Sequence, residues 1–517
     1  MNQANLPEIN VGIKPKLLVF IVAYHAESTI SSVLSRIPHS LVDTFHIEVL
    51  IIDDASKDQT FEIGLKIARD GNLPFQVHVL FNPVNQGYGG NQKIGYHYAI
   101  EHGFDFVALV HGDGQYAPER LGELIQPLVN GTADAVFGSR MLTRGQALKG
   151  GMPLYKYVGN KILTAFENKM LNSNLSEFHS GYRLYSTKAL KQVPFDLNTN
   201  DFHFDTEIIV QFIFAGLRIT ELPIPTYYGD EICRVNGMKY AWDVVVAVTK
   251  SKAQSMGLFY SPNFDCAHKG NEHYELKLNY QSPHSEILKH ISPGSQILDL
   301  GCAGGYIGAL LKDKLGCTVT GVDYFDLDPK ITLDEFIKFD LNKGLPDLDF
   351  GRFDYIVMLD VVEHLNNPEF FIKSLQKKLG PYPKVTVIAS TGNIGFIIPR
   401  LMLLFGQFNY GKRGILDLTH TRLFTFSSFR RLFSQNSFQV SSMIGIPGPF
   451  PLAIGSNFLS RLLISLNTIG IKISRGLCSY QIFMISKPLP SLAHLLSNSI
   501  SESQIRSRSF SDNDQPL

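Results

Sequence analysis

FVALVHGDGQYAPE, residues 106–119, is an apolar run that breaks at His111 and passes into a polar turn. Short β-branched and apolar runs of this length predict a buried strand. Ligands of open α/β sheets bind at the carboxyl ends of the strands. The stretch therefore predicts a strand that delivers His111, Asp113 and Gln115 to a ligand-binding edge, where a carboxylate can hold a cation.

Size and composition set the outer limits. With 517 residues the chain is too long for one ordinary core, so two domains are expected. Basic and acidic residues number 47 each, which gives no support to a nucleic-acid partner. Five scattered cysteines lack the spacing of a zinc site or a disulfide framework, and the first residues lack the pattern of a signal peptide. We expect a cytoplasmic protein.

Two apolar segments, 394–408 and 458–473, are amphipathic enough to lie on a membrane surface. Neither provides the roughly 18 uninterrupted apolar residues that a spanning helix needs. We interpret both as core helices. Peripheral contact with the cytoplasmic face of a membrane is the alternative.

Short apolar strands alternate with amphipathic helical stretches from Lys16, and a second such series starts near Ser282. This alternation predicts mainly parallel sheets covered on both faces, so the fold class is α/β with two doubly wound domains in series. The expected parts are an N-terminal tail (1–14), a first domain (15–255), a polar linker (256–280), a second domain (281–490) and a disordered Ser-rich tail (491–517).

Polar side chains follow the strands of the first series. Glu27 follows the first strand, and Asp53 and Asp54 end the second in "IIDDAS". Such an Asp pair can accept hydrogen bonds from a base and a ribose hydroxyl, or it can cap a helix. Asn85 precedes the glycines of "NQGYGGN", whose helix start could approach a phosphate although the spacing is no Walker A motif.

The order of these motifs, continuing through "HGDGQYAPE", "FGSR", "EFHSGYR" and "FDTEI", resembles the family 2 inverting glycosyltransferases, and within them the polyprenyl-phosphate group similar to dolichyl-phosphate mannose synthase. The resemblance covers about residues 15–255 and implies a GT-A-like nucleotide-sugar domain. The family motif Asp-x-Asp-x-Gln binds Mg²⁺ or Mn²⁺ with the donor diphosphate. Asp113 and Gln115 match its last two ligands, whereas His111 stands at the first. Imidazole suits Mn²⁺ better than Mg²⁺, and a non-ligand role for His111 is the alternative.

The resemblance also implies contacts to phosphates. Arg140 and Arg183 stand at motif positions near the donor diphosphate or the acceptor phosphate, where planar guanidinium groups fit phosphate oxygens. Arg234 and Lys239 belong to the basic loop expected to cover the acceptor phosphate. A polyprenyl phosphate is already an anion, so its attack needs positioning rather than a strong base.

A hydroxyl acceptor would require a different arrangement. A carboxylate would then have to take the hydroxyl proton, and Asp205 and Glu207 in "FHFDTEI" are the candidates. Their alternative role is simply to place negative charge at a helix N-terminus.

The second series opens with QILDLGCAGGYIG, residues 296–308, which is a strand, an acid and a glycine-rich turn into a helix. It resembles the class I S-adenosylmethionine (SAM) methyltransferases over about residues 280–488, which implies a Rossmann-like domain. Gly301 and Gly305 would leave room for the amino-acid end of SAM, and Asp299 would orient it. Ala303 replaces a usual glycine, which predicts slight crowding; a disabled cofactor pocket is the alternative.

Further strand ends complete this pattern. Asp323 is spaced to accept from both ribose hydroxyls, and Asp340 fits the acid near the adenine amine. An oxygen methyl acceptor would need deprotonation, for which His364 is the first candidate base and His420 the second, unless they are structural. The residues of "LDVVEHL" expected to face the cleft are Asp360, Glu363 and His364.

The sequence thus predicts a bifunctional enzyme. One half would transfer a sugar from a nucleotide sugar to a polyprenyl phosphate or a glycan, and the other would methylate a small molecule or glycan with SAM. The alternative is that the first half only binds a nucleotide sugar or a lipid phosphate and recruits an active methyltransferase.

Overall fold

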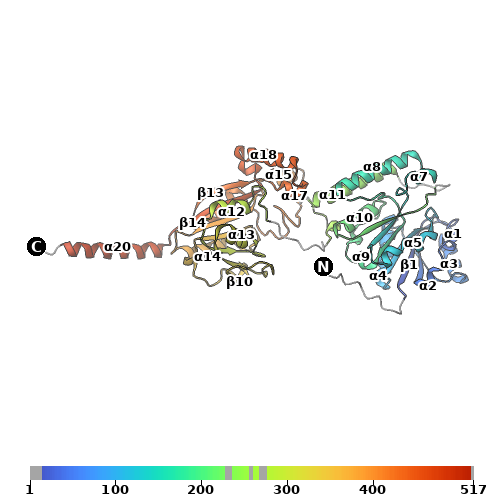
Figure 1. Ribbon diagram of the computed structural model, residues 1–517, viewed down its shortest axis with the longest axis horizontal. Coiled ribbons are helices and arrows are strands. Elements are labelled where there is room, and N and C mark those ends of the chain that lie inside the picture. The colour runs from blue at the N-terminus through green and yellow to red at the C-terminus, as the bar shows by residue number, and fades with distance from the viewer. Residues whose placement is uncertain (1–13, 228–235, 256–259, 267–275, 514–517) are drawn as a thin grey trace. The chain divides into compact units, whose positions relative to one another are not determined.

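The computed structural model describes residues 14–227, 236–255, 260–266 and 276–513 (Figure 1). The chain forms two compact units, and each is built on a seven-stranded sheet. Both sheets are mixed but mainly parallel, with helices on their faces, which confirms the predicted fold class. Residues 262–264 belong to the expected linker. They form a short turn, η3 (Pro262–Phe264), whose Phe264 packs into the core of the first unit.

The sheet of the first unit has the strand order β3-β2-β1-β4-β6-β5-β7, and only β6 runs antiparallel to its neighbours. The order reverses between β1 and β4, which is where such sheets bind ligands. Register pairs Val22 with His111 and Ala23 with Asp53, so these strand ends share one edge. The strands are β1 (Lys16–Ala23), β2 (His46–Asp53), β3 (Gln76–Phe81), β4 (Phe106–His111), β5 (Ala135–Ser139), β6 (Arg183–Ser186) and β7 (Ile219–Pro223).

Strand β1 shows why this sheet is covered on both faces. Its side chains alternate between two cores, with Val19 and Ile21 in one and Leu18 and Phe20 in the other. The helices described for this unit are α1 (Ile30–Ser35), α2 (Leu41–Thr44), α3 (Thr60–Asp70), α4 (Gly87–Glu101), α5 (Leu121–Leu124), α6 (Gln126–Val129), α7 (Gln146–Lys149), α8 (Leu154–Leu171), α9 (Thr187–Leu190), α10 (Phe204–Phe214) and α11 (Gly237–Ser255), with 3₁₀ turns η1 (Pro118–Arg120) and η2 (Phe195–Leu197).

The second sheet has the order β10-β9-β8-β11-β12-β14-β13, with β14 antiparallel to both of its neighbours. Its order reverses between β8 and β11. The strands are β8 (Gln296–Leu300), β9 (Thr318–Asp323), β10 (Glu335–Lys338), β11 (Tyr355–Leu359), β12 (Thr386–Gly392), β13 (Phe438–Ile446) and β14 (Gln481–Pro488). The helices are α12 (Pro283–His290), α13 (Tyr306–Leu315), α14 (Pro368–Leu379), α15 (Ile397–Leu404), α16 (Phe426–Ser434), α17 (Phe450–Ile454), α18 (Phe458–Ile473), α19 (Arg475–Cys478) and α20 (Leu492–Asn513), with 3₁₀ turns η4 (Leu341–Lys343), η5 (Phe350–Arg352) and η6 (Val362–His364).

The two apolar segments 394–408 and 458–473 form α15 and α18, and the expectation that both are core helices is wrong. Only Pro399 of α15 and Ser460 of α18 are buried, whereas large apolar side chains of both helices are exposed. The apolar periodicity of both segments is helical, but periodicity alone does not determine which way an apolar face points. Among the described residues, none of the helices is long and apolar enough to cross a membrane.

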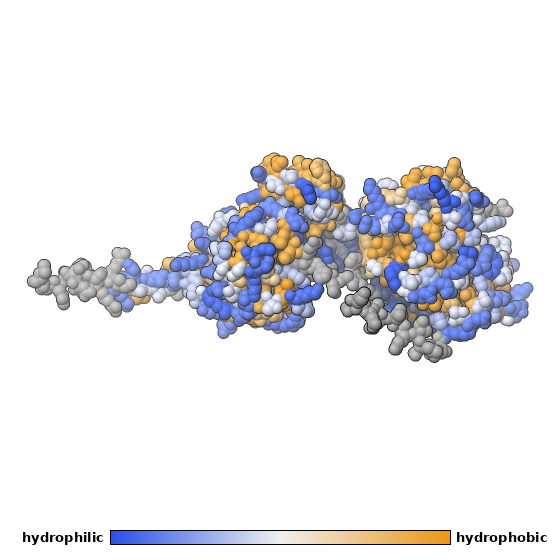
Figure 2. All heavy atoms as spheres, viewed as in Figure 1, coloured by the Kyte–Doolittle hydropathy of each residue, from blue (hydrophilic) through white to orange (hydrophobic). Residues whose placement is uncertain are grey.

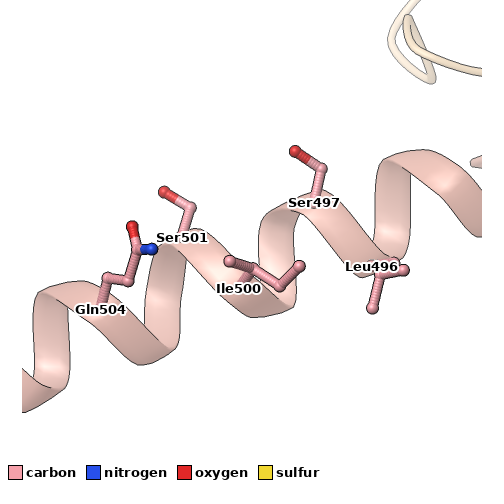
Figure 3. A pocket seen from close by; sticks show the side chains of 5 residues that line it. All are labelled: Leu496, Ser497, Ile500, Ser501 and Gln504. Carbon is pink, nitrogen blue, oxygen red and sulfur yellow. The ribbon is translucent and has the colours of Figure 1, made fainter.

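The C-terminal segment, expected to be disordered, is described as helix α20. Its first turns carry Leu492, Leu495, Leu496 and Ile500, a helical spacing that the Ser-rich composition obscures. A shallow hollow on α20 is lined by Leu496, Ser497, Ile500, Ser501 and Gln504 (Figure 3). All five side chains come from this single helix, so the hollow is an open surface rather than a binding cavity.

Candidate active sites

Asp53 carries a buried, unsatisfied oxygen at the reversal edge of the first sheet. Its Oδ1 accepts a hydrogen bond from the backbone of Ser56 at 3.1 Å, but its buried Oδ2 has no partner among the described residues. Burial raises the pKa of Asp53, although the bonds from Ser56 oppose this. Buried polar atoms nearly always have a partner, so Asp53 is ready to accept a hydrogen bond from a ligand.

Asp54 and Asn85 have structural partners instead. Asp54 Oδ1 accepts from the side chain of Asn82 and the backbone of Gln86, each at 2.8 Å, and its Oδ2 accepts from Gly87 at 3.0 Å. Asn85 donates to the carbonyl of Asp54 at 2.8 Å. Asp54 therefore caps α4. The geometry thus supports the capping role of Asp54, but the capped helix is α4, which follows β3, and not α3, which follows Asp54 in the sequence.

Glu27 serves the neighbouring helix. One of its carboxylate oxygens accepts from the backbone of Gln59 at 2.9 Å, at the N-terminus of α3. This bond ties the loop after β1 to α3. The carboxylate of Glu27 thus has a protein partner and helps to shape this edge of the sheet.

His111 lies at the end of β4 and is half-buried. Its Nε2 lies 3.2 Å from the hydroxyl of Tyr88, which lies 3.0 Å from Oδ2 of Asp205. A carboxylate only accepts, so Tyr88 donates to Asp205 and receives the Nε2 proton of His111. Burial lowers the pKa of His111, with Asp113 the largest opposing influence, so the imidazole is neutral. Its Nδ1 lone pair remains for a ligand.

The glycine before Tyr182 explains how closely this ring is held. A Cβ added at Gly181 would lie 2.4 Å from Nε2 of His111, and the backbone N–H of Gly181 donates to the hydroxyl of Tyr116 at 2.7 Å. Asp113 is exposed, and its Oδ1 accepts from the backbone of Gln115 at 3.0 Å. The predicted metal ligands therefore lie on one short turn, with two oxygen donors beside a neutral imidazole.

Both predicted phosphate-binding arginines have protein partners. Arg183, 1 % exposed, donates to the carbonyls of Phe178, Ser180 and Asp205 at 2.7–3.1 Å and lies 3.5 Å from the Asp205 carboxylate. Arg140 is buried and contacts Glu177 through its side chain and its backbone N–H. Burial opposes ionisation of Glu177, but Arg140 holds the pKa of this carboxyl below its usual range.

These ion pairs give Arg140 and Arg183 partners inside the fold, and their expected contact with a phosphate stays a prediction. A planar guanidinium fits a carboxylate as well as a phosphate, and here each fork is filled from inside the fold. Both side chains are buried among the described residues. Both arginines instead hold the segment 176–183 that packs against His111.

Asp205 and Glu207 differ in position although they share helix α10. Asp205 belongs to the network of His111, Tyr88 and Arg183. Glu207 points the other way, accepting from the backbone of Thr199 at 2.6 Å and the side chain of Asn263 at 3.4 Å. Burial raises the pKa of Glu207. The structure therefore does not bring Glu207 to the His111 edge.

Lys239 pairs with acids rather than lying open. Its Nζ is 2.8 Å from Asp201 and 4.0 Å from Asp243, and these two acids and His203 could bring three ligand atoms within 4.8 Å of one another. The ammonium group already compensates this cluster. Arg234, the other predicted residue of the basic loop, lies outside the described residues.

In the second unit, Asp299 repeats the pattern of Asp53. It is buried, and its Oδ2 has no partner within the described part of the chain. Burial, followed by the nearby charge of Asp323, raises the pKa of Asp299 to about 7. A cationic ligand would stabilise the charged form of such a carboxyl.

Asp323 organises the glycine-rich turn. Its Oδ2 accepts from the backbone of Ala303 at 2.7 Å and its Oδ1 from Phe325 at 2.9 Å. Gly301, Ala303 and Gly305 have φ values of 78°, 47° and 82°. Ala303 thus adopts the left-handed conformation that favours glycine, with its methyl group on the exposed side of the turn.

Asp340 and Asp360 stand at the neighbouring strand ends. Asp340 is half-buried, directly follows a residue bonded to the Asp323 carbonyl, and caps η4 through Asn342. The carboxylate of Asp360 is filled by Ser390 and Gln481, each at 2.7 Å. Asp340 therefore lies at the strand-end edge of the sheet, whereas the carboxylate of Asp360 is bonded to Ser390 and Gln481 behind it.

His364 and His420 face each other, with ring centroids 4.7 Å apart. Nδ1 of His364 lies 3.0 Å from Thr419 Oγ1 and 3.3 Å from its carbonyl, and Nδ1 of His420 lies 2.9 Å from the carbonyl of Ile415. A carbonyl only accepts, so both Nδ1 atoms carry the proton and both Nε2 atoms keep a lone pair. Either imidazole can therefore accept a proton at Nε2.

Glu363, which the sequence placed in the cleft, is buried between these groups and β12. Its Oε1 accepts from the backbone of Gly392 at 3.3 Å. Burial, followed by Asp360, raises the pKa of Glu363 to about 8. The sequence does not predict Tyr88 and Thr419, which orient the imidazoles. Both lie inside quoted motifs, "NQGYGGN" and "DLTHTRLFT", but the histidines that they contact are distant in sequence.

Comparisons with known proteins identify a family for each half of the chain. Residues 18–193 match the glycosyl transferase family 2 model, and residues 272–442 match a methyltransferase domain model. The UDP-N-acetylglucosamine–dolichyl-phosphate N-acetylglucosaminyltransferase of Methanococcus voltae is 30 % identical over 225 residues, 42 % of this chain and 87 % of its own. The chain therefore belongs to glycosyltransferase family 2, and it carries a methyltransferase domain as a second enzymatic half.

Other relatives match in part. The undecaprenyl-phosphate mannosyltransferase of Micrococcus luteus is 28 % identical over 211 residues, 40 % of this chain and 82 % of its own. The mitochondrial ubiquinone biosynthesis O-methyltransferase of Arabidopsis thaliana is 36 % identical over 94 residues, 16 % of this chain and 28 % of its own. A glucosyl-3-phosphoglycerate synthase structure from Mycobacterium tuberculosis overlays with a TM-score of 0.35 and 20 % identity, covering 45 % and 79 % of the two chains.

Proposed function

We propose that the first unit transfers a sugar from a nucleotide-sugar donor to polyprenyl phosphate. The observation that carries this proposal is the buried, unpaired Oδ2 of Asp53 at the reversal edge, beside the turn of Asp113 and Gln115. An N–H group of the nucleotide base would satisfy Asp53. The named activities of the relatives from M. voltae and M. luteus, which act on polyprenyl phosphates, support this acceptor class.

The surface of α8 supports a lipid-linked acceptor as well. Leu154, Val158 and Ile162 recur at helical spacing and are 45–66 % exposed, with Tyr155 beside them. Exposed apolar rows of this kind are uncommon on soluble monomers and fit a lipid chain. The phosphate of such an acceptor is already charged, so the donor edge has to position it rather than deprotonate it.

A divalent cation fits the donor turn. Asp113 and Gln115 would hold it with oxygen atoms, and His111 would offer Nδ1, a donor set that suits Mn²⁺ better than Mg²⁺. When bound, the cation supplies charge neutralisation for the leaving nucleoside diphosphate. The chain itself keeps His111 neutral and oriented through Tyr88.

For the second unit we propose SAM-dependent methylation of a small molecule or glycan. Asp299 would meet the cationic amino-acid end of SAM, Asp323 the ribose, and Asp340 the adenine edge, while Gly301 and Gly305 leave space for close approach. His364, with His420 second, would take the proton of a hydroxyl acceptor at Nε2. The buried Oδ2 of Asp299 is again the observation that supports a cationic ligand.

One incubation tests both halves. The full chain would be mixed with UDP- and GDP-sugars, polyprenyl phosphate, Mn²⁺ and labelled SAM, and the products identified by mass. We expect a polyprenyl-phosphate sugar and a labelled methyl product. Asp113→Ala should abolish only the first and Asp299→Asn should weaken only the second. Donor binding without turnover, unaffected by Mn²⁺, would instead favour the recruiting-module alternative.

A further inference from the structure

Helix α18 presents an apolar face to the outside of its unit. Phe458, Leu459, Leu462, Leu466, Ile469 and Ile473 are 43–84 % exposed. At about 100° per residue these six positions fall within an arc of roughly 100° on the helix. In Figure 1 α18 lies at one end of the methyltransferase unit together with α15 and α17, and Figure 2 shows hydrophobic residues gathered there.

The polar contacts of α18 explain why this face points outward. Asn467, on the opposite side of the helix, accepts from the backbone of Gly448 at 2.9 Å and donates to the carbonyl of Cys478 at 2.8 Å. These bonds fasten the polar side of the helix to the segments that flank β13 and β14. These hydrogen bonds therefore hold α18 with its polar side inward and its apolar side outward, whereas an ordinary surface helix turns its apolar side toward the core.

Helix α15 adds to the same end of the unit. Leu401, Leu403, Leu404 and Phe405 are 42–76 % exposed. The residue that leads into this segment, Asn393, donates to the carbonyls of Gly476 within α19 and of Ser479 directly after it. The segment that leads into α15 and the end of α18 are thus connected through the short helix α19, at the carboxyl end of β12.

Charge over this part of the chain is strongly one-sided. Residues 370–501 contain fourteen Lys and Arg side chains but a single acidic residue, Asp417, although the whole chain is balanced at 47 each. Arg461 and Lys472 flank the apolar arc of α18 on one side, are exposed, and form no ion pair within the described residues. Basic side chains at the edge of an apolar stripe can reach anionic headgroups while the stripe enters the acyl region.

We propose that the methyltransferase unit docks on a membrane surface containing anionic lipids through the exposed face of α18, with α15 beside it. The apolar arc enters the interface, and Arg461 and Lys472 contact the headgroups. The charge asymmetry argues for a lipid surface over a second copy of the chain, because two copies would bring like charges together. This docking is independent of which sugar or methyl acceptor the enzyme uses.

Flotation of the full chain with vesicles tests the proposal. We expect binding to phosphatidylcholine vesicles that contain phosphatidylglycerol and weaker binding to phosphatidylcholine alone. The double variant Leu466→Asp/Ile469→Asp should lower the partition coefficient at least about tenfold, because the interface excludes carboxylates. Phe370→Asp, at an equally exposed apolar position on α14, is the matched control and should bind like wild type.

A second pair of variants tests the charge. Arg461→Gln and Lys472→Gln should each lower binding to the anionic vesicles about fivefold and leave binding to phosphatidylcholine unchanged. Each variant should unfold at the wild-type temperature, since these side chains are exposed. No binding to either vesicle, or wild-type binding by Leu466→Asp/Ile469→Asp, would overturn the proposal. So would light scattering that finds a dimer which this double variant dissociates.

Discussion

The hydroxyl oxygen of Tyr88 lies 3.2 Å from Nε2 of His111. This contact fixes the imidazole at the position where related glycosyltransferases are expected to carry a carboxylate. The Tyr88 proton goes to Asp205, and burial, followed by Asp205, raises the pKa of Tyr88, which keeps the phenol protonated. The imidazole of His111 is thus held in one orientation.

Removing this hydroxyl should affect stability and metal binding together. Tyr88→Phe removes the hydroxyl that donates to Oδ2 of Asp205 and accepts the Nε2 proton of His111, which should cost about 1–3 kcal/mol in the free energy of unfolding. Urea denaturation measures the first effect, and Mn²⁺ titration followed by electron paramagnetic resonance the second. Tyr98→Phe on the same helix is the control, since its hydroxyl has no hydrogen-bond partner in the described ranges. Equal effects of the two variants would contradict the assigned role.

Substitutions of the two adjacent aspartates at the end of β2 should have different effects, one on nucleotide binding and the other on stability. Asp53→Asn removes a charged acceptor, so the dissociation constant of the donor nucleotide should rise about 10- to 100-fold in calorimetry. Asp54→Asn places an amide N–H₂ against the backbone N–H groups that Asp54 now accepts, and should lower stability by about 1–2 kcal/mol. Unchanged nucleotide affinity in Asp53→Asn would show that its free oxygen does not meet the base.

SAM binding should be linked to the titration of Asp299. Its pKa of about 7 lies above the ordinary value of 3.8, so the stability it contributes is complete below about pH 4 and is lost as pH rises through about 7. A bound cation favours the charged carboxyl, hence SAM should bind with proton release near neutral pH and more tightly at pH 8 than at pH 6. Calorimetry in buffers of different ionisation enthalpy measures the release. Asp299→Asn should lose this component, and identical proton release in that variant would rule out Asp299 as its source.

The left-handed turn at Ala303 should be improvable. Ala303→Gly relieves an unfavourable φ and should raise the free energy of unfolding by about 0.5–1 kcal/mol, with SAM affinity within a few-fold of wild type. Gly301→Ala should destabilise, because its Cβ would lie 2.5 Å from Val361 Cγ2. A tenfold or larger gain in SAM affinity from Ala303→Gly would instead support the idea that the alanine disables the pocket.

The rate of methyl transfer should depend on His364 more strongly than the affinity for SAM does. His364→Ala should lower kcat by about 100-fold or more with little change in the SAM dissociation constant, and His420→Ala should have a smaller effect. Thr419→Val removes the hydroxyl that holds Nδ1 of His364 and should shift the pH profile of kcat. If Thr419 had only a structural role, Thr419→Val would lower stability, but the folded variant would keep the wild-type pH profile of kcat.

Strand-end acids could be predicted because long apolar strands fix both the sheet and its edge. Asp53 and Asp323 are the last residues of β2 and β9, and Asp299 is the last residue but one of β8, so the structure places each at the carboxyl end of a strand near a reversal of strand order. The ion pairing of Arg140 and Arg183 could not be predicted, because their partners Glu177 and Asp205 are distant in sequence and a guanidinium fits a carboxylate as well as a phosphate.

The direction of α18 was equally hidden from the sequence. Its apolar spacing defines a stripe but not the side to which it turns. Asn467 decides that through contacts with Gly448 and Cys478, which become neighbours only after folding. The helical spacing was visible in advance, whereas the outward face required the tertiary contacts.

The turn η3 governs where the two halves can be separated. Asn263 in this turn accepts from Gln211 at 2.6 Å and donates to Glu207, and Phe264 is buried against the same core. A recombinant glycosyltransferase fragment ending at Ser255 would remove one hydrogen-bond partner each from Gln211 and Glu207 of α10 and would uncover the apolar core against which Phe264 packs. A shortened gene for that half should therefore run past Phe264, or its product will be prone to aggregate.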